Sequence, residues 1–99
     1  MSKVFGKEPS MNLYKMILEL KDLDECYRFF QDLCTVSELR AMEQRFDVAV
    51  LLQKGMIYNE ILEQTGASSA TISRVNRAIK DGCDGYQIIF DRTEKTEEK

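Results

Sequence analysis

Apolar residues recur every three or four positions along most of this chain, and no segment alternates apolar and polar residues in the manner of a strand. A spacing of three to four residues is typical of α-helices that bury one face. Polar residues and glycines interrupt the pattern and predict about six helices, over residues 11–21, 22–33, 36–54, 58–65, 69–81 and 84–90. The pattern therefore predicts an all-α fold with one helical domain over residues 11–90.

Residues that begin and end helices separate these segments. A Ser, Thr or Asp followed three residues later by Glu or Gln can form a capping box, which supplies acceptors to free backbone N–H groups. Three pairs fit this pattern: Asp22 with Glu25, Thr35 with Glu38, and Asp84 with Gln87. Ser10 is expected to cap the first helix, and Gly55, Gly66 and Gly82 are expected to end the helices that precede them.

The first two predicted helices carry many large apolar side chains for their length. A chain of 99 residues has little interior in which to bury them. They can form an intramolecular core or the interface of a dimer, and the sequence leaves both interpretations open. The third helix becomes apolar almost all round towards its end, so we expect it to be buried on two sides as a central element.

Residues 58–81 are expected to form two short helices joined by a tight turn. Ile61 and Leu62 are predicted to face inward from the first of them. Gly66 ends that helix, because glycine takes positive φ at no steric cost. Ser68 or Ser69 can cap the second helix. Its apolar residues fall on one face at helical spacing, and they are Ile72, Val75, Ala78 and Ile79.

The rest of the second helix carries small, hydroxyl and basic side chains. These candidate DNA-binding residues are Ser68, Ser69, Ala70, Thr71, Ser73, Arg74, Arg77 and Lys80. In a helix-turn-helix the second helix lies in the DNA major groove, with its N-terminal residues at base edges. Small residues let the backbone come close, hydroxyls bond bases or phosphates, and basic groups pair with phosphate or guanine. The alternative is an ordinary helical hairpin with a solvated basic face.

The net charge of −3 and the pI of about 5.0 argue against a protein that coats nucleic acid by bulk charge. Residues 68–80 nevertheless contain three basic residues and no acidic one. DNA binding through this face would depend on orientation and would be strongly sensitive to salt.

Three cysteines and the absence of histidine bound the chemistry of the chain. The odd count and the lack of a Cys-x-x-Cys pair indicate reduced thiols in the cytoplasm. Without histidine, a Cys–His nucleophile is excluded and the usual zinc sites lose their ligands, so we expect neither an enzyme nor a metal site.

No apolar run approaches the length of a membrane span. Residues 1–10 are expected to form a flexible arm, and the charged residues 91–99 a disordered tail.

Several runs of this sequence resemble the Trp repressor superfamily. They are Ser37-Glu38-Leu39-Arg40, Leu51-Leu52-Gln53-Lys54-Gly55, Glu60-Ile61, Gly66-Ala67 and Ala70-Thr71-Ile72-Ser73-Arg74. The resemblance covers residues 13–90 and is most specific in 37–80. In length and in its acidic tail, the chain is most similar to Trp-repressor-related proteins of the YerC/YecD type. The resemblance implies an intertwined homodimer that presents two helix-turn-helix units to a pseudo-palindromic operator, with Ser69, Ala70 and Ser73 reading the bases.

The same resemblance implies an effector pocket between two arginines, which match Arg45 and Arg74 here. In the Trp repressor these arginines hold tryptophan. Two neighbouring positions differ, because a glycine of the family is Val75 in this chain and a ligand-binding serine is Ala78. Val75 would occupy space that the indole ring needs, and Ala78 lacks a polar group for the amino end of the ligand. The sequence therefore argues against tryptophan as a corepressor and predicts no cofactor, although the arginines could bind a smaller anionic effector or pair with nearby acids.

These observations favour a sequence-specific transcriptional regulator, by resemblance a repressor, that binds double-stranded operator DNA as a cytoplasmic homodimer. The alternative is a helical dimerising adaptor whose helix-turn-helix binds protein. An adaptor of that kind would need an apolar outer face over residues 68–80, where the sequence places hydroxyl and basic groups.

Overall fold

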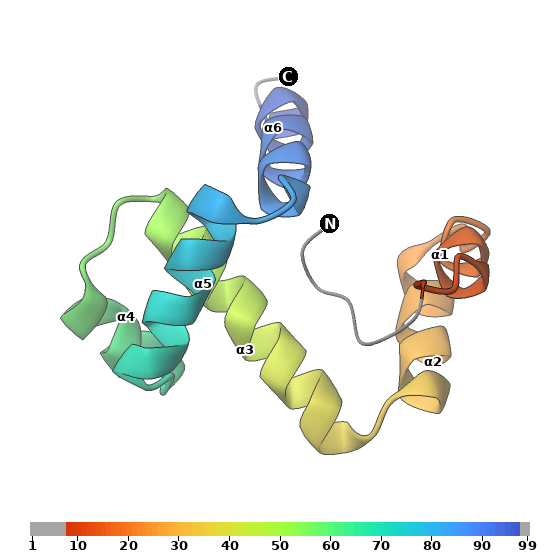
Figure 1. The fold of residues 1–99 in the computed structure, drawn as a ribbon, viewed down its shortest axis with the longest axis horizontal. Helices are drawn as coiled ribbons and strands as arrows, with labels where there is room; N and C mark the ends of the chain where they lie inside the picture. The colour runs from red at the N-terminus through yellow and green to blue at the C-terminus, as the bar shows by residue number, and fades with distance from the viewer. Residues whose placement is uncertain (1–7, 98–99) are drawn as a thin grey trace. The chain divides into compact units, whose positions relative to one another are not determined.

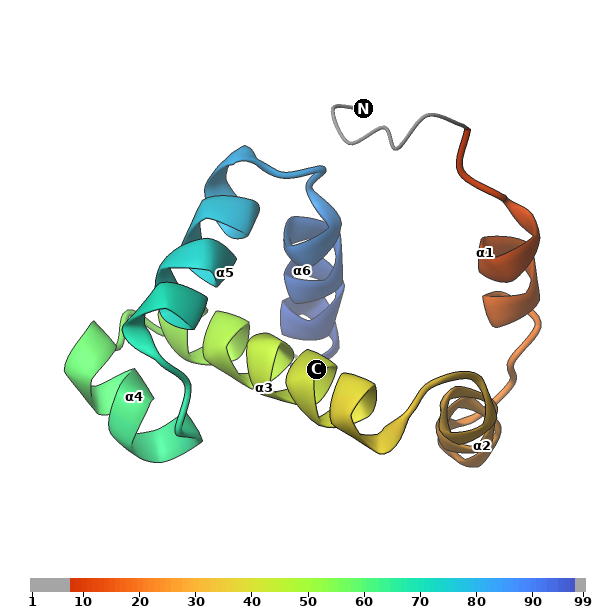
Figure 2. The same ribbon diagram turned by 60° about the horizontal axis from the view of Figure 1, so that its bottom comes forward.

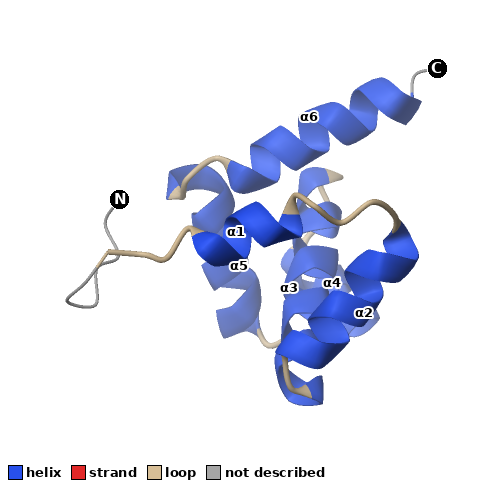
Figure 3. Ribbon diagram, turned by 90° about the vertical axis from the view of Figure 1, so that its right-hand side faces the viewer, coloured by secondary structure: helices blue, strands red, loops and turns tan. Residues whose placement is uncertain are grey.

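Six helices make up the part of the chain that the computed structural model describes, which is residues 8–97, with side chains up to residue 94 (Figure 1). In chain order they are α1 (Asn12–Ile17), α2 (Leu23–Leu33), α3 (Val36–Gln53), α4 (Tyr58–Thr65), α5 (Ser69–Asp81) and α6 (Gly85–Glu97). Figure 3 shows only helices and connecting loops in this range. The predicted all-α fold of about six helices is confirmed. Most of the arm predicted for residues 1–10, and residues 98–99 of the predicted tail, lie outside the described residues.

The chain divides into two compact units, Met1–Arg40 and Ala41–Lys99. The first holds α1, α2 and the start of α3, and the second holds the remaining helices. The predicted division into an arm, a single domain and a tail stays a prediction. Within residues 8–97 no helix is long and apolar enough to cross a membrane.

The first helix is shorter than predicted. It begins at Asn12 after Met11, which makes no side-chain capping bond, so the cap expected from Ser10 is wrong. After Ile17 the backbone N–H groups of Glu19 and Leu20 bond to carbonyls three residues back, at 3.0 and 3.1 Å, which tightens the chain into a turn. No residue of α1 is buried, so tertiary packing does not extend the helix to the predicted end at residue 21.

Two of the predicted capping boxes stabilise helix starts. The Asp22 carboxylate accepts a hydrogen bond from the Glu25 N–H at 2.9 Å, while the Glu25 carboxylate accepts one from the Lys21 N–H at 2.9 Å. At the start of α3, Glu38 accepts from the Thr35 N–H at 2.8 Å and the Thr35 hydroxyl accepts from the Glu38 N–H at 3.2 Å. The backbone N–H of Thr35 lowers the pKa of the Glu38 carboxyl, because this hydrogen bond favours the ionised form.

The end of α3 is a complete Schellman motif, in which Gly55 takes the left-handed conformation with φ of 86°. The Met56 N–H bonds to the Leu51 carbonyl at 3.1 Å and the Gly55 N–H bonds to the Leu52 carbonyl at 3.0 Å. The prediction that Gly55 ends this helix is confirmed, and the turn directs the chain into α4.

The core of the second unit forms where α4, α5 and α6 gather around α3 (Figure 2). Its fully or nearly buried residues are Val48, Ala49, Ile61, Ala67, Ile72, Val75 and Phe90. The rings of Phe46, Tyr86 and Phe90 lie within 6.0 to 6.4 Å of one another and join α3 to α6. The prediction of a central third helix is therefore supported by its contacts in this unit.

Two residues predicted to face inward are exposed. Leu62 is 42% exposed and lies on the outer side of α4, while its neighbour Ile61 is fully buried. Ala78 is exposed on α5, whereas Ile72 and Val75 occupy the core. A helix turns 100° between consecutive residues, so the width of a buried face depends on what packs against it, which the spacing alone does not define.

The last helix is longer than predicted and begins differently. The pairing of Asp84 with Gln87 as a capping box is wrong, because Asp84 takes a left-handed conformation with φ of 68° and the Gln87 amide donates to Asp91 at 2.9 Å. The Thr93 hydroxyl donates to the Ile89 carbonyl at 2.8 Å. Both bonds join residues four apart in α6, and the helix continues to Glu97 through residues that the sequence analysis assigned to a disordered tail.

Candidate nucleic-acid interface

The turn between α4 and α5 is built around one left-handed residue. Gly66 has φ of 74°, and its N–H bonds to the Leu62 carbonyl at 2.9 Å. A Cβ built on Gly66 would meet no atom within 4 Å. The position therefore requires glycine for its backbone conformation rather than for space.

Ser68 is the residue that caps α5, which decides between the two candidates of the sequence analysis. Its hydroxyl oxygen accepts a hydrogen bond from the Thr71 N–H at 3.1 Å and lies 3.1 Å from the Thr71 hydroxyl oxygen. Ser69 is the first residue of the helix. The hydroxyls of Ser68 and Thr71 thus hold the first turn in place, while Ser69 and Ala70 remain exposed beside them.

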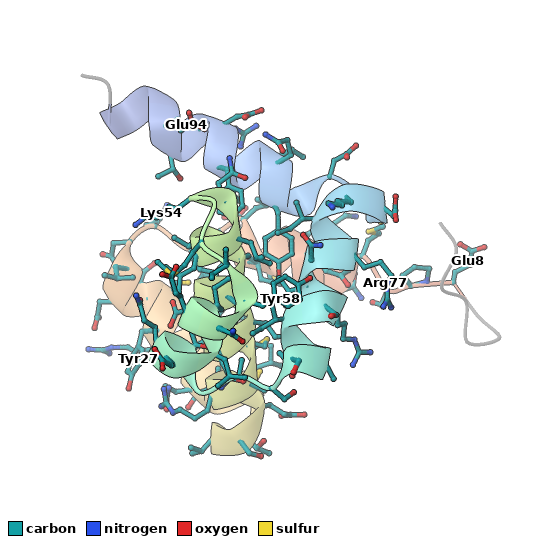
Figure 4. All side chains as sticks on the ribbon, turned by 90° about the vertical axis from the view of Figure 1, so that its left-hand side faces the viewer. Glu8, Tyr27, Lys54, Tyr58, Arg77 and Glu94 are labelled. Atoms are coloured by element: carbon teal, nitrogen blue, oxygen red, sulfur yellow. The ribbon has the colours of Figure 1, made fainter. Side chains whose placement is uncertain are left out.

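Most of the predicted DNA-binding residues share the exposed side of α5. The exposed members are Ser68, Ser69, Ala70, Arg74, Arg77 and Lys80, and the half-buried members are Thr71 and Ser73. Ile72 and Val75 hold the opposite side of the helix in the core, at 0% and 2% exposure. Figure 4 shows the side chain of Arg77 extending away from the body of this unit. The core-facing residues therefore fix which side of α5 is exposed.

The electrostatics of this side follow from the helix direction and from its charges. The first turn of α5 contains no acidic residue, and Lys80 lies in the last turn. The N-terminus of a helix carries partial positive charge from its free N–H groups, which favours anions such as phosphate. Arg74 and Arg77 extend this positive region along the exposed side.

The four residues of the implied effector pocket are not equally accessible. Arg45, Arg74 and Ala78 are exposed, whereas Val75 is 2% exposed and belongs to the core cluster. The side chain of Val75 is thus packed among Ile61, Ile72 and their neighbours. Among the described side chains, those of residues 8–94, no group of Asp, Glu or Cys is arranged to hold a metal ion.

The sequence analysis missed two residues that support the turn. The Gln44 side-chain amide in α3 donates to the Thr65 carbonyl at 3.1 Å. The Thr65 hydroxyl donates to the Ile61 carbonyl at 2.8 Å and accepts from the Ala67 N–H at 3.1 Å. A threonine just before a helix-ending glycine is a weak local signal, and no sequence signal joins it to Gln44, which lies 21 residues away.

The sequence of this chain matches a family of known proteins. The model of the Trp repressor protein family matches residues 10–94. The chain is 50% identical over 95 residues to the uncharacterised protein YerC of Bacillus subtilis (strain 168), in an alignment that covers 96% of this chain and 90% of that protein.

Two crystal structures are similar in fold and in sequence. A TrpR-like protein from Eubacterium eligens aligns with a TM-score of 0.80 and 52% identity over 83% of this chain and 84% of that chain. A proposed Trp repressor from Staphylococcus aureus aligns with a TM-score of 0.79 and 46% identity over 83% of this chain and 82% of that chain.

Proposed function

Because the chain belongs to the Trp repressor family, we propose that it is a sequence-specific DNA-binding transcriptional regulator, and specifically a repressor that acts as a homodimer. The observation that carries this proposal is the form of α5. Ile72 and Val75 are packed in the core, and the exposed side of the helix offers small residues at the N-terminus followed by basic ones. This is the arrangement that a recognition helix needs in the major groove.

Each part of the exposed side has a role in the proposal. Ser69 and Ala70 lie at the tip, where a hydroxyl can bond a base edge and a methyl group can pack on thymine. Arg74 and Arg77 pair with phosphates or with guanine. Lys80 contributes a phosphate contact at the far end of the helix. The hydrogen bonds between Ser68 and Thr71 stabilise the conformation of this first turn of α5.

The homodimer is supported by the first unit of the chain. Neither α1 nor α2 contains a buried residue. Leu18 and Leu23 are 83% and 84% exposed, and several other large apolar residues of this unit are at least half exposed. Burial of such surface against a second copy is favourable at about 25 cal/mol per Å². Two recognition helices would then contact successive major grooves, about 34 Å apart.

The exposed side of α5 disfavours the adaptor as a second function. Over residues 68–80, all of which the structure describes, no large apolar side chain is exposed. A protein-binding face would need such anchors.

The proposed DNA-binding role needs no catalytic group. In this proposal the protein acts in the cytoplasm, which suits the free thiols of Cys26, Cys34 and Cys83.

The proposal extends to regulation by small molecules. We infer that tryptophan is not the effector, because Val75 fills its part of the core and the Ala78 side chain offers no hydrogen bond. A smaller anion could bind at Arg45 or Arg74. No bound cofactor is needed for the DNA contacts described above.

The function is tested by selecting bound duplexes from a random pool and then measuring the affinity of variants for the selected operator. Arg74→Ala and Arg77→Ala should each weaken binding, and a lost phosphate contact should lower the salt slope by about one unit. A lost base contact should instead relax the preference at one position, by about 1–3 kcal/mol.

Lys54→Ala provides a control that removes the same charge elsewhere in the unit. Figure 4 shows Lys54 and Arg77 on opposite sides of the helices of this unit. The Lys54 variant should bind the operator like the unmodified protein. If no duplex is enriched, or if neither arginine affects affinity, the assignment of α5 as a recognition helix is wrong.

A further inference from the structure

A chain of side-chain hydrogen bonds joins α3 to the turn that precedes the recognition helix. It starts at Gln44, whose amide donates to the Thr65 carbonyl at 3.1 Å. The Thr65 hydroxyl then bonds both to the Ile61 carbonyl at 2.8 Å and to the Ala67 N–H at 3.1 Å. All three bonds are partly buried.

Two of these bonds satisfy backbone groups that the turn leaves without a partner, and the bond to the Ile61 carbonyl holds the Thr65 hydroxyl in position. Thr65 is the last residue of α4, and the final carbonyls of a helix have no partner within it. Ala67 lies beyond the helix end and is 1% exposed, so water has little access to its N–H. Buried backbone groups without a partner are costly, which gives these bonds a defined role in holding the turn.

The turn determines where the tip of α5 lies. Ala67 is followed directly by Ser68, the residue that caps α5. A shift of Ala67 would therefore move Ser68, Ser69 and Ala70 together. Gln44 connects this segment to α3, which contributes Val48 and Ala49 to the core of the same unit.

We propose that Gln44 and Thr65 are positioning residues, which set the specificity of DNA recognition by fixing the tip of α5 against α3. Neither residue is assigned a contact with DNA. The inference rests on the proposed function, because it concerns the accuracy with which the recognition helix meets base edges. Contacts to bases need closer placement than contacts to phosphates, so a loosened tip should reduce binding to the operator more than binding to unrelated DNA.

The test uses substitutions that keep the volume and remove the bonds. Thr65→Val removes both hydroxyl bonds, Gln44→Met removes the amide donor, and Thr65→Ser keeps the hydroxyl. Thr93→Val is the matched control, because the Thr93 hydroxyl makes an equivalent 2.8 Å bond to the Ile89 carbonyl in α6. Affinities for the selected operator and for a shuffled duplex are measured at a temperature where circular dichroism shows each variant to be folded.

Thr65→Val and Gln44→Met should each lower operator affinity roughly threefold to tenfold, the effect of about one net hydrogen bond. Affinity for the shuffled duplex should change little. Thr65→Ser should retain the preference for the operator, and Thr93→Val should leave it unchanged. Amide hydrogen exchange at Ala67 should be faster in Thr65→Val, which reports loosening of the turn directly.

A merely stabilising role would lower the melting temperature and leave the ratio of the two affinities unchanged. That result in folded Thr65→Val and Gln44→Met overturns the inference. If Thr65→Val does not fold, Gln44→Met alone decides, because it leaves the hydroxyl of the turn in place. If the unmodified protein does not prefer any selected duplex over the shuffled one, the proposed function itself fails.

Discussion

Neighbouring residues of α5 have different roles, and the exposure of each side chain distinguishes these roles. Arg74 is exposed and available to a partner, while Val75 beside it is 2% exposed and packs in the core. Ser68 and Thr71 bond to each other and shape the first turn, so they support the tip as well as lining it. The residues available for the proposed contacts with bases are therefore fewer than the hydroxyl and basic residues of the sequence suggest.

Val75 leads to a prediction about effectors. Free tryptophan should not bind at micromolar concentration or change operator affinity, because the valine side chain is fixed within a packed cluster. Forcing extra volume into a packed site costs about 1–3 kcal/mol, enough to weaken binding roughly tenfold. Titration calorimetry with tryptophan, with and without operator, measures both effects.

A double variant, Val75→Gly with Ala78→Ser, provides the reverse test. It opens the space and restores a hydroxyl on the exposed side of α5, so a gain of tryptophan binding would support this explanation. Its stability must be measured alongside, since removal of a buried side chain and glycine within a helix both destabilise the fold. Micromolar binding by the unmodified protein, together with tighter operator binding, would contradict the prediction.

The helix-turn-helix depends on the conformation of Gly66. Gly66→Ala should destabilise the protein by about 1 kcal/mol, because a side chain at positive φ is strained even though the space is open. Gly85→Ala is the matched control, since Gly85 also has open space but lies within α6. It should be neutral or stabilising by about 0.5 kcal/mol. Urea unfolding measures the difference in stability between the two variants. Equal effects would show that a side chain at position 66 causes no strain.

The helix ends that the sequence predicts well are those with a local signal. The end of α4 and the start of α5 follow from Gly66 and Ser68, whose effects act within one turn of the backbone. The sequence analysis missed the end of α1 at Ile17 because it depends on the absence of packing. It missed the full length of α6 because the side-chain bonds within this helix have no clear sequence signal. The exposure of Leu62 and the bond from Gln44 to Thr65 depend on how α3 lies against α4, which no local signal encodes.

The start of α3 should make stability sensitive to acid. The Thr35 N–H lowers the pKa of Glu38 in the folded chain below its value in the unfolded chain. The contribution is therefore complete above the ordinary pKa of glutamic acid, about 4.3, and is lost as the pH falls through the lower folded pKa. Glu38→Gln, which keeps the side-chain acceptor without the charge, should lose less stability than the unmodified protein between pH 7 and pH 3. Identical pH profiles in urea unfolding would contradict this assignment.

At the scale of the whole molecule, the net negative charge is compatible with DNA binding only if the basic side of α5 faces the DNA. The chain carries a net charge of −3, while the exposed side of α5 is basic. A part of the chain that presents acidic residues to the phosphates would be repelled by them. We therefore expect weak non-specific binding and a steep decrease of operator affinity with salt, since specific binding still displaces counterions at the phosphates.

The first unit leads to the prediction of a dimer in solution. Its helices α1 and α2 contain no buried residue in the single chain, and Leu18 and Leu23 are 83% and 84% exposed. Sedimentation equilibrium at micromolar concentration should give roughly twice the chain mass of 11.5 kDa.

Leu18→Lys and Leu23→Lys identify the surface that forms this dimer. Each should shift dissociation to concentrations at least about tenfold higher, because a leucine buried on association contributes about 1.5–3 kcal/mol. Ile57→Lys is the control, since Ile57 is 62% exposed but precedes α4 in the other unit. It should leave the dissociation constant unchanged. A monomer at micromolar concentration would exclude the intertwined arrangement, and with it the spacing of two recognition helices on one operator. A dimer that only Ile57→Lys disrupts would place the interface on the helix-turn-helix instead.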